Sequence, residues 1–164
     1  MSDTDPAAAE QARLARLANL LFGAARQGDT ALLREAMAGG APPDLTNQNG
    51  DSLVMLAAYH GHAESVRVLL EAGAAVDQVN DRGQTPLSGA TFKGFAEVVA
   101  TLLEFGADPG AGTPPPVSVA VVFGREDLLA LFEARAARGV AGPSDGDDRG
   151  DGGRGGAPDD AGAV

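Results

Sequence analysis

Short helical patterns of apolar residues, separated by glycines and polar turns, occupy the chain between about residues 20 and 135. One of them predicts a helix over residues 63–71, because its apolar positions share one helix face: Val66, Leu69 and Leu70. A shorter apolar run precedes it, with Ser52 suited to cap its start and Gly61 to end it. Helices this small cannot bury their own apolar stripe, so each pair has to pack against a neighbouring pair.

The pattern returns after 33 residues. The recurring landmarks are Gly50 and Gly83, Ala57 and Ala90, Gly61 and Gly94, Leu69-Leu70 and Leu102-Leu103, and Gly73-Ala74 and Gly106-Ala107. In the second copy Thr85 is the expected N-cap and Pro86 takes the first helical position, where a missing N–H is harmless. Fixed-period repetition indicates a solenoid. Four units are expected, at about 7–46, 47–79, 80–112 and 113–138.

These landmarks resemble the ankyrin repeat, most clearly in Thr85-Pro86-Leu87, Ala57-Ala58, Gly61-His62 and the Leu-Leu-Glu-Ala-Gly-Ala run at 69–74. The resemblance implies an all-α solenoid of stacked helix-turn-helix units with short hairpin-like loops. It places His62 where the family prefers a histidine for helix capping. The chain departs from the pattern at several positions: Leu53-Val54 in place of Pro-Leu, Met55 and Ser88 in place of histidine, and Gly89 in place of an apolar residue.

The outer units have the features of caps. Residues 7–26 form a long amphipathic stretch with one leucine face, and Asp5 before Pro6 is a suitable N-cap. The face contains Leu14, Leu17, Leu20 and Leu21. A long first helix with a polar outer face would close the open end of the stack, as terminal repeats must. The last unit lacks the Gly-Ala ending and finishes in a run that contains Arg135 and Arg138.

The two ends of the chain differ from the repeats in composition. Residues 139–164 carry two Arg and six Asp in a glycine-rich run that has almost no large apolar side chain. Such a run cannot offset its ordering entropy by burial, so we expect a disordered acidic tail at 139–164 and a short disordered start at 1–6.

Composition excludes several kinds of chemistry. The chain has no cysteine, which removes thiolate metal sites and cysteine nucleophiles. Its formal net charge of −11 argues against nucleic acid and anionic membranes as partners. There is no secretory signal, phosphate-binding loop or catalytic constellation, so we expect a cytoplasmic protein that is not an enzyme and has no cofactor.

The two histidines, His60 and His62, could supply at most two metal ligands, and no third ligand is evident in the sequence. We interpret them as structural or surface residues. The tail contains partial matches to a dinucleotide-binding motif at 150–155 and to a calcium loop at 145–156. Neither match has the required context, because the first lacks a flanking strand and helix and the second lacks its bidentate glutamate.

In ankyrin repeats, partners are commonly held by the hairpin tips and by exposed residues of the first helix. Carried onto this chain, the tips are Gln48, Asn49, Asp51, Asp81, Arg82 and Gln84. The helix positions form a row along the solenoid: Arg26, Gln27, Tyr59, His60, Phe92, Lys93, Val122 and Phe123. Stacking should carry Tyr59, Phe92 and Phe123 to one concave side, where exposed aromatic rings are typical of interface hot spots. The alternative is that Phe92 and Val122 only fill the groove beneath the hairpins.

The resemblance and this row predict a monomeric, non-catalytic module that binds another protein. The acidic tail is suited to tethering, to solubility or to steering a basic partner. A second hypothesis is an accessory factor for the stability or maturation of a specific enzyme, with a metal-assisted role for His60. A zinc titration separates the two hypotheses.

Overall fold

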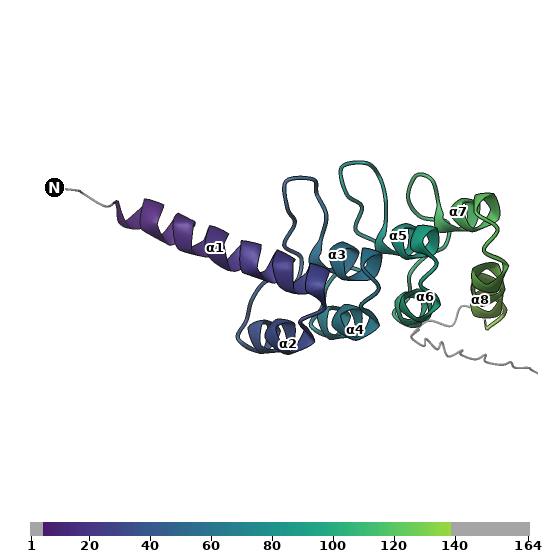
Figure 1. Cartoon of the computed structure of the whole chain (residues 1–164), viewed down its shortest axis with the longest axis horizontal. Helices are drawn as coiled ribbons and strands as arrows, with labels where there is room; N and C mark the ends of the chain where they lie inside the picture. The colour runs from purple at the N-terminus through teal and green to yellow at the C-terminus, as the bar shows by residue number, and fades with distance from the viewer. Residues whose placement is uncertain (1–4, 139–164) are drawn as a thin grey trace, which may run out of the picture.

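Residues 5–138 are described by the computed structural model, and they form eight α-helices in four consecutive pairs (Figure 1). The pairs are α1 (Pro6–Gln27) with α2 (Thr30–Ala38), α3 (Leu53–Tyr59) with α4 (Ala63–Glu71), α5 (Pro86–Lys93) with α6 (Ala96–Glu104), and α7 (Pro116–Val122) with α8 (Glu126–Ala137). Within these residues the only β pairing is an isolated bridge between Thr46 and Ser52. The predicted all-α solenoid is confirmed. The predicted acidic tail at 139–164 and residues 1–4 of the predicted disordered start lie outside the described residues. The prediction of disorder is wrong for the last two residues of 1–6, because Asp5 caps α1 and Pro6 begins it.

Local chemistry sets the helix ends where the sequence predicted them. The hydroxyl of Ser52 accepts a hydrogen bond from the Met55 N–H at 3.0 Å, and that of Thr85 accepts one from the Ser88 N–H at 3.1 Å. Asp5 caps α1 in the same way, through the N–H of Ala7. Gly73 follows α4 with φ of 103°, a left-handed conformation that a side chain would strain.

The helices stack in two layers. The first helices of the pairs pack in the order α1, α3, α5 and α7, and the second helices in the order α2, α4, α6 and α8 (Figure 1). Leucines that are fully buried between the layers include Leu21, Leu33, Leu69, Leu102 and Leu128. Each pair shares its core with the next, so the solenoid holds together through neighbour contacts.

A repeated contact joins each unit to the one before it. The side chain that follows the inter-helix glycine packs over the corresponding glycine of the preceding unit: His62 on Gly28, Phe95 on Gly61 and Arg125 on Gly94. A Cβ added at Gly28 would lie 2.5 Å from the His62 ring, so only glycine fits there. The His62 side chain makes no cap bond at the start of its own helix, α4. Its ring nitrogen Nε2 instead lies 2.9 Å from the carbonyl oxygen of Arg26 in the last turn of α1, so the expected capping contact forms with the helix of the preceding unit.

Ion pairs link the second helices across unit boundaries. Arg34 and Glu64 approach to 3.3 Å, and the guanidinium of Arg67 donates two hydrogen bonds to Glu104, at 2.8 and 3.0 Å. The Arg67 guanidinium also lies 5.6 Å from the centre of the Phe105 ring. These contacts therefore join the second helices of neighbouring units.

The first helix corrects one expectation. Leu14, Leu17 and Leu20 are 55%, 41% and 55% exposed, and the N-terminal half of α1 projects beyond the stack (Figure 1). Only the C-terminal half of the helix packs, through Leu21, Phe22, Ala24 and Ala25. The expectation that the whole first helix closes the end of the stack is therefore wrong for its N-terminal half, because the leucine stripe extends further along α1 than the neighbouring helices do (Figure 1).

No helix among residues 5–138 combines the length and the apolarity needed to cross a lipid bilayer.

Candidate functional site

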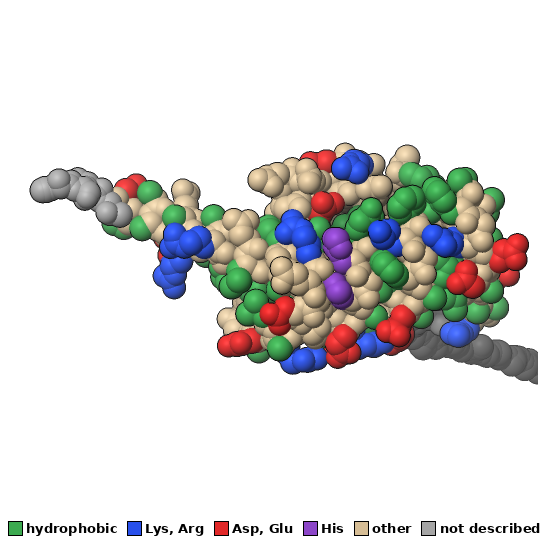
Figure 2. Space-filling view, in the orientation of Figure 1, with side chains coloured by type: hydrophobic (Ala, Val, Ile, Leu, Met, Phe, Trp, Pro, Cys, Tyr) green, Lys and Arg blue, Asp and Glu red, His purple; other side chains and the backbone are tan. Residues whose placement is uncertain are grey.

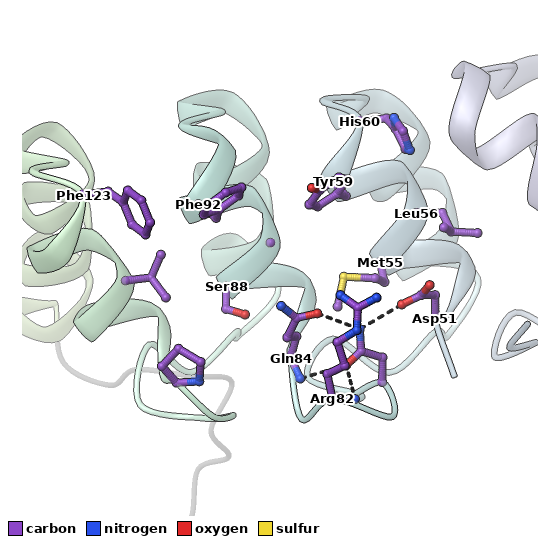
Figure 3. A pocket seen from close by; sticks show the side chains of 14 residues that line it. Asp51, Met55, Leu56, Tyr59, His60, Arg82, Gln84, Ser88, Phe92 and Phe123 are labelled. Carbon is purple, nitrogen blue, oxygen red and sulfur yellow. Dashed lines mark hydrogen bonds between the residues drawn. The ribbon is translucent and has the colours of Figure 1, made fainter. Parts of the chain in front are cut away.

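The C-terminal ends of α3, α5 and α7 carry three aromatic side chains in a row (Figure 3). Tyr59 is the last residue of α3, Phe92 is the penultimate residue of α5, and Phe123 follows α7 directly. In each unit a left-handed glycine ends the helix shortly after the ring. Tyr59 and Phe92 stand two residues before this glycine and are equivalent, whereas Phe123 stands one residue before it.

The three rings are exposed but held by their neighbours. Tyr59 is 39% exposed, Phe92 43% and Phe123 50%. The rings of Phe92 and Phe123 meet edge to face at a centroid distance of 5.1 Å, and the Lys93 ammonium lies 5.0 Å from the Tyr59 ring centre. Such contacts orient the rings before any partner arrives. The alternative that Phe92 and Val122 only fill the groove is wrong, because Val122 is 75% exposed and Phe92 remains open to solvent.

A pocket of about 510 Å³ opens beside this row, between the first helices and the loops (Figure 3). Its walls combine side chains of α3, α5 and α7 with polar groups of the loops. The lining residues are Asp51, Met55, Leu56, Tyr59, His60, Asn80, Arg82, Gln84, Ser88, Gly89, Phe92, Pro114, Val119 and Phe123. The pocket therefore presents an apolar wall and a polar rim to the same ligand.

Gly89 gives the pocket its depth. A Cβ built at this position would meet the Met55 sulfur and the Tyr59 ring, both at 3.4 Å. The missing side chain therefore leaves space between α3 and α5. The substitution of Gly89 for an apolar residue of the repeat pattern accounts for this space.

Two buried or half-buried asparagines hold the loops. The side-chain oxygen of Asn80 accepts hydrogen bonds from the backbone N–H groups of Arg82 and Gln84, and its amide donates to Asp51 and to the Gln84 side chain. Asn47 accepts from the N–H groups of Asn49 and Asp51 in the preceding loop. The N–H of Asp81 donates to the Asn49 carbonyl oxygen at 3.0 Å, which links the two loops.

The structure brings half of the predicted site residues to the pocket. Those that line it are Asp51, Tyr59, His60, Arg82, Gln84, Phe92 and Phe123. The others are exposed but lie outside its walls: Arg26, Gln27, Gln48, Asn49, Asp81, Lys93 and Val122. That all of them contact a partner stays a prediction.

Sequence reasoning missed the asparagines and most of the apolar wall. Asn47 and Asn80 are 33 residues apart and each stands three residues before a glycine, so the repeat period could have identified them. Met55 and Ser88 were noted only as departures from the repeat pattern. Both are buried, and both contribute to the wall of the pocket.

His60 lies at the edge of the pocket with its ring against Tyr59, at a centroid distance of 5.6 Å. Partial burial lowers the pKa of its imidazole, and the nearby charges of His62, Arg26 and Lys93 lower it further. Within residues 5–138, no cluster of three or more His, Asp or Glu side chains could hold a metal ion.

Comparison with known proteins agrees with this architecture. A family model described as ankyrin repeats, in three copies, matches residues 21–113. A protein of Pseudomonas aeruginosa that is named as an ankyrin repeat protein is 52% identical over 40 residues. That match covers 24% of this chain and 23% of the relative, so the chain matches about a quarter of the relative's length.

Proposed function

Because the chain belongs to the ankyrin repeat family, we propose that it is a non-catalytic module that binds another protein on the face formed by Tyr59, Phe92 and Phe123. Ankyrin repeats are in general protein-protein interaction modules. The observation that carries the assignment to this face is the row of three exposed aromatic rings, held in place along one pocket.

Physical chemistry favours this face for recognition. Large side chains that are already oriented lose little conformational entropy on binding, so a few of them can supply most of the binding free energy. Elsewhere in the stack the large apolar side chains of α2, α4, α6 and α8 are buried or half-buried. The pocket adds polar groups at its rim, which fix the orientation of a bound segment.

The test is affinity capture from a lysate of the source organism with the full chain as bait. Replacing Tyr59 and Phe92 together by Ala should weaken partner binding by at least about 2 kcal/mol, roughly thirtyfold in affinity. The matched control is Val117→Ala with Val121→Ala, which removes two exposed apolar side chains of α7 that do not line the pocket. Circular dichroism should show that both variants stay folded, because all four side chains are more than a third exposed, and binding is compared well below each melting temperature.

A protein retained by the wild type and the control but lost by the double variant supports the proposal. Unchanged capture by a folded double variant rules out this face and directs attention to the loop tips at Asp81 and Arg82. The alternative of a metal-assisted maturation factor predicts zinc binding in the nanomolar range that His60→Ala abolishes.

A further inference from the structure

Positively charged side chains run along the same face, although the chain as a whole is strongly acidic. Lys93 lies over the Tyr59 ring, and the Arg125 guanidinium donates to the Phe92 carbonyl oxygen at 2.9 Å. Arg26, His60 and His62 continue the row toward α1, and the charges of Arg26 and His62 lower the pKa of His60. Figure 2 shows the two histidines in the middle of this face, with Lys and Arg side chains on both sides. We call Arg26, His60, Lys93 and Arg125 the cationic row.

Within residues 5–138, no carboxylate forms an ion pair with this row. The three ion pairs formed within residues 5–138 join Arg13 to Glu10, Arg34 to Glu64, and Arg67 to Glu104, so none of them includes a member of the row. The Nε of Arg125 is buried without a hydrogen-bond partner among these residues. The carboxylate of the pocket, Asp51, is held by the amides of Asn47 and Asn80 at the loop end.

Like charges gathered on one face repel one another, and this repulsion is relieved when a ligand of opposite charge binds. The face combines three such charges, on Arg26, Lys93 and Arg125, and the titratable His60 with exposed rings and an apolar pocket wall. A ligand that satisfies both features has carboxylates beside a large apolar side chain.

We propose, on the basis of the proposed function, that the partner presents an acidic peptide segment to this face. Its large apolar side chain enters the pocket between α3, α5 and α7, and its flanking carboxylates lie on the cationic row. Local charge at the contact decides the complementarity of an interface, whereas net charge acts mainly on long-range steering. The net charge of −11 therefore does not select a basic partner for this face. The exposed rings and the apolar wall of the pocket need an apolar side chain to cover them, which favours a protein segment over a phosphate backbone as the source of the anions.

The test is a selection of random displayed peptides on the full chain. Peptides are scored against the wild type, against Tyr59→Ala with Phe92→Ala, and against Arg26→Gln with Lys93→Gln. The matched control for the last variant is Arg13→Gln with Arg34→Gln, which removes two exposed positive charges elsewhere and leaves the same net charge. A second control, Arg26→Lys with Lys93→Arg, keeps the charge of the row.

Peptides that bind the wild type but not Tyr59→Ala with Phe92→Ala should be acidic and contain an aromatic or branched aliphatic residue. Their affinity should fall about tenfold in Arg26→Gln with Lys93→Gln, and should remain in both controls. Added salt should weaken the wild-type complex and should have little effect on the complex with the charge-removed variant.

The outcomes separate the two proposals. If no selected peptide depends on Tyr59 and Phe92, the proposed function fails. If such peptides exist but are neutral or basic, or bind the charge-removed variant as well as the wild type, the proposed function stands and the acidic partner is overturned. An oligonucleotide that binds through Arg26 and Lys93 more tightly than any selected peptide also overturns it.

Discussion

The two helix layers of the solenoid use their charged and aromatic side chains differently. Among the second helices, Arg67 pairs with Glu104 and stacks against Phe105, so a cation and an aromatic ring both serve the contact between neighbouring units. Among the first helices, Lys93 and Tyr59 also meet, but both stay exposed beside a pocket. Side chains committed to a neighbouring unit are not available to a partner. Both layers hold neighbouring units together, but in the first layer aromatic and positively charged side chains also stay exposed beside a pocket, where a partner can reach them.

The largest expected effect on stability is at Asn80, which both lines the pocket and holds a loop in place. Asn80 lines the pocket, yet its buried amide satisfies two backbone N–H groups and Asp51. Asn80→Ala leaves these groups unpaired and should lower the free energy of unfolding by about 2–3 kcal/mol. Urea unfolding measures it, with Gln48→Ala at the neighbouring exposed loop tip as the control. Equal urea midpoints for Asn80→Ala and Gln48→Ala would show that water replaces the hydrogen bonds of the Asn80 side chain and that these bonds do not stabilise the fold.

A smaller loss of stability is expected on the side of the second helices. Gly73→Val places a branched side chain at a φ of 103° and should cost about 1–2 kcal/mol, while selected peptides bind as before. The control is Gly39→Val, which follows α2 with φ of −84° and meets no such strain. A loss of binding in Gly73→Val, measured well below its unfolding transition, contradicts the separation of the two layers.

Features of the fold that depend on neighbouring residues could be predicted from the sequence. Ser52, Thr85 and Gly73 could be assigned from the sequence because a cap or a left-handed glycine acts within a few residues. The row of Tyr59 and Phe92 followed from the repeat period, since equivalent positions align in a stack.

Features that depend on what lies opposite a side chain could not be predicted. Periodicity revealed the stripe of Leu14, Leu17 and Leu20 but not that the neighbouring helices end before they cover it. The positive charges of Lys93 and Arg125 were visible in the sequence. Only the structure shows that they share one face and make no ion pair within residues 5–138.

A third change tests the pocket without removing any contact. Gly89→Leu fills the space between Met55 and Tyr59 and should weaken peptide binding by at least about tenfold. Leucine favours a helix over glycine by up to about 1 kcal/mol, but its atoms beyond Cβ crowd Met55 and Tyr59, so the melting temperature is measured alongside binding. Gly89→Ala is the matched control, since its methyl group makes only ordinary contacts at 3.4 Å and should leave binding intact. Full binding by Gly89→Leu, measured by fluorescence anisotropy, would mean that the ligand avoids the pocket.

The smallest effect concerns pH. The folded state lowers the pKa of His60 below its ordinary value of 6.5, by burial first and then by the charges of His62, Arg26 and Lys93. Below that pH the unfolded chain takes up a proton that the folded chain resists, so stability should decrease as pH falls through this window. His60→Gln should remove this part of the pH dependence in urea unfolding. An acidic peptide favours protonated His60, so its affinity should rise over the same range, and pH-independent affinity contradicts a contact with His60.

In the repeated contact between units, a side chain packs over the inter-helix glycine of the preceding unit. This contact affects how the array can be lengthened. The socket consists of a glycine and backbone, while the side chain that enters it is an imidazole, a phenyl ring or a guanidinium. A contact surface made of main-chain atoms requires a large side chain opposite it but does not select the chemical type of that side chain. Units that keep the glycine can therefore be duplicated, exchanged or grafted from another array without matched changes in their neighbours. Gene duplication can lengthen the array one unit at a time, and a protein engineer can extend the recognition face in the same way.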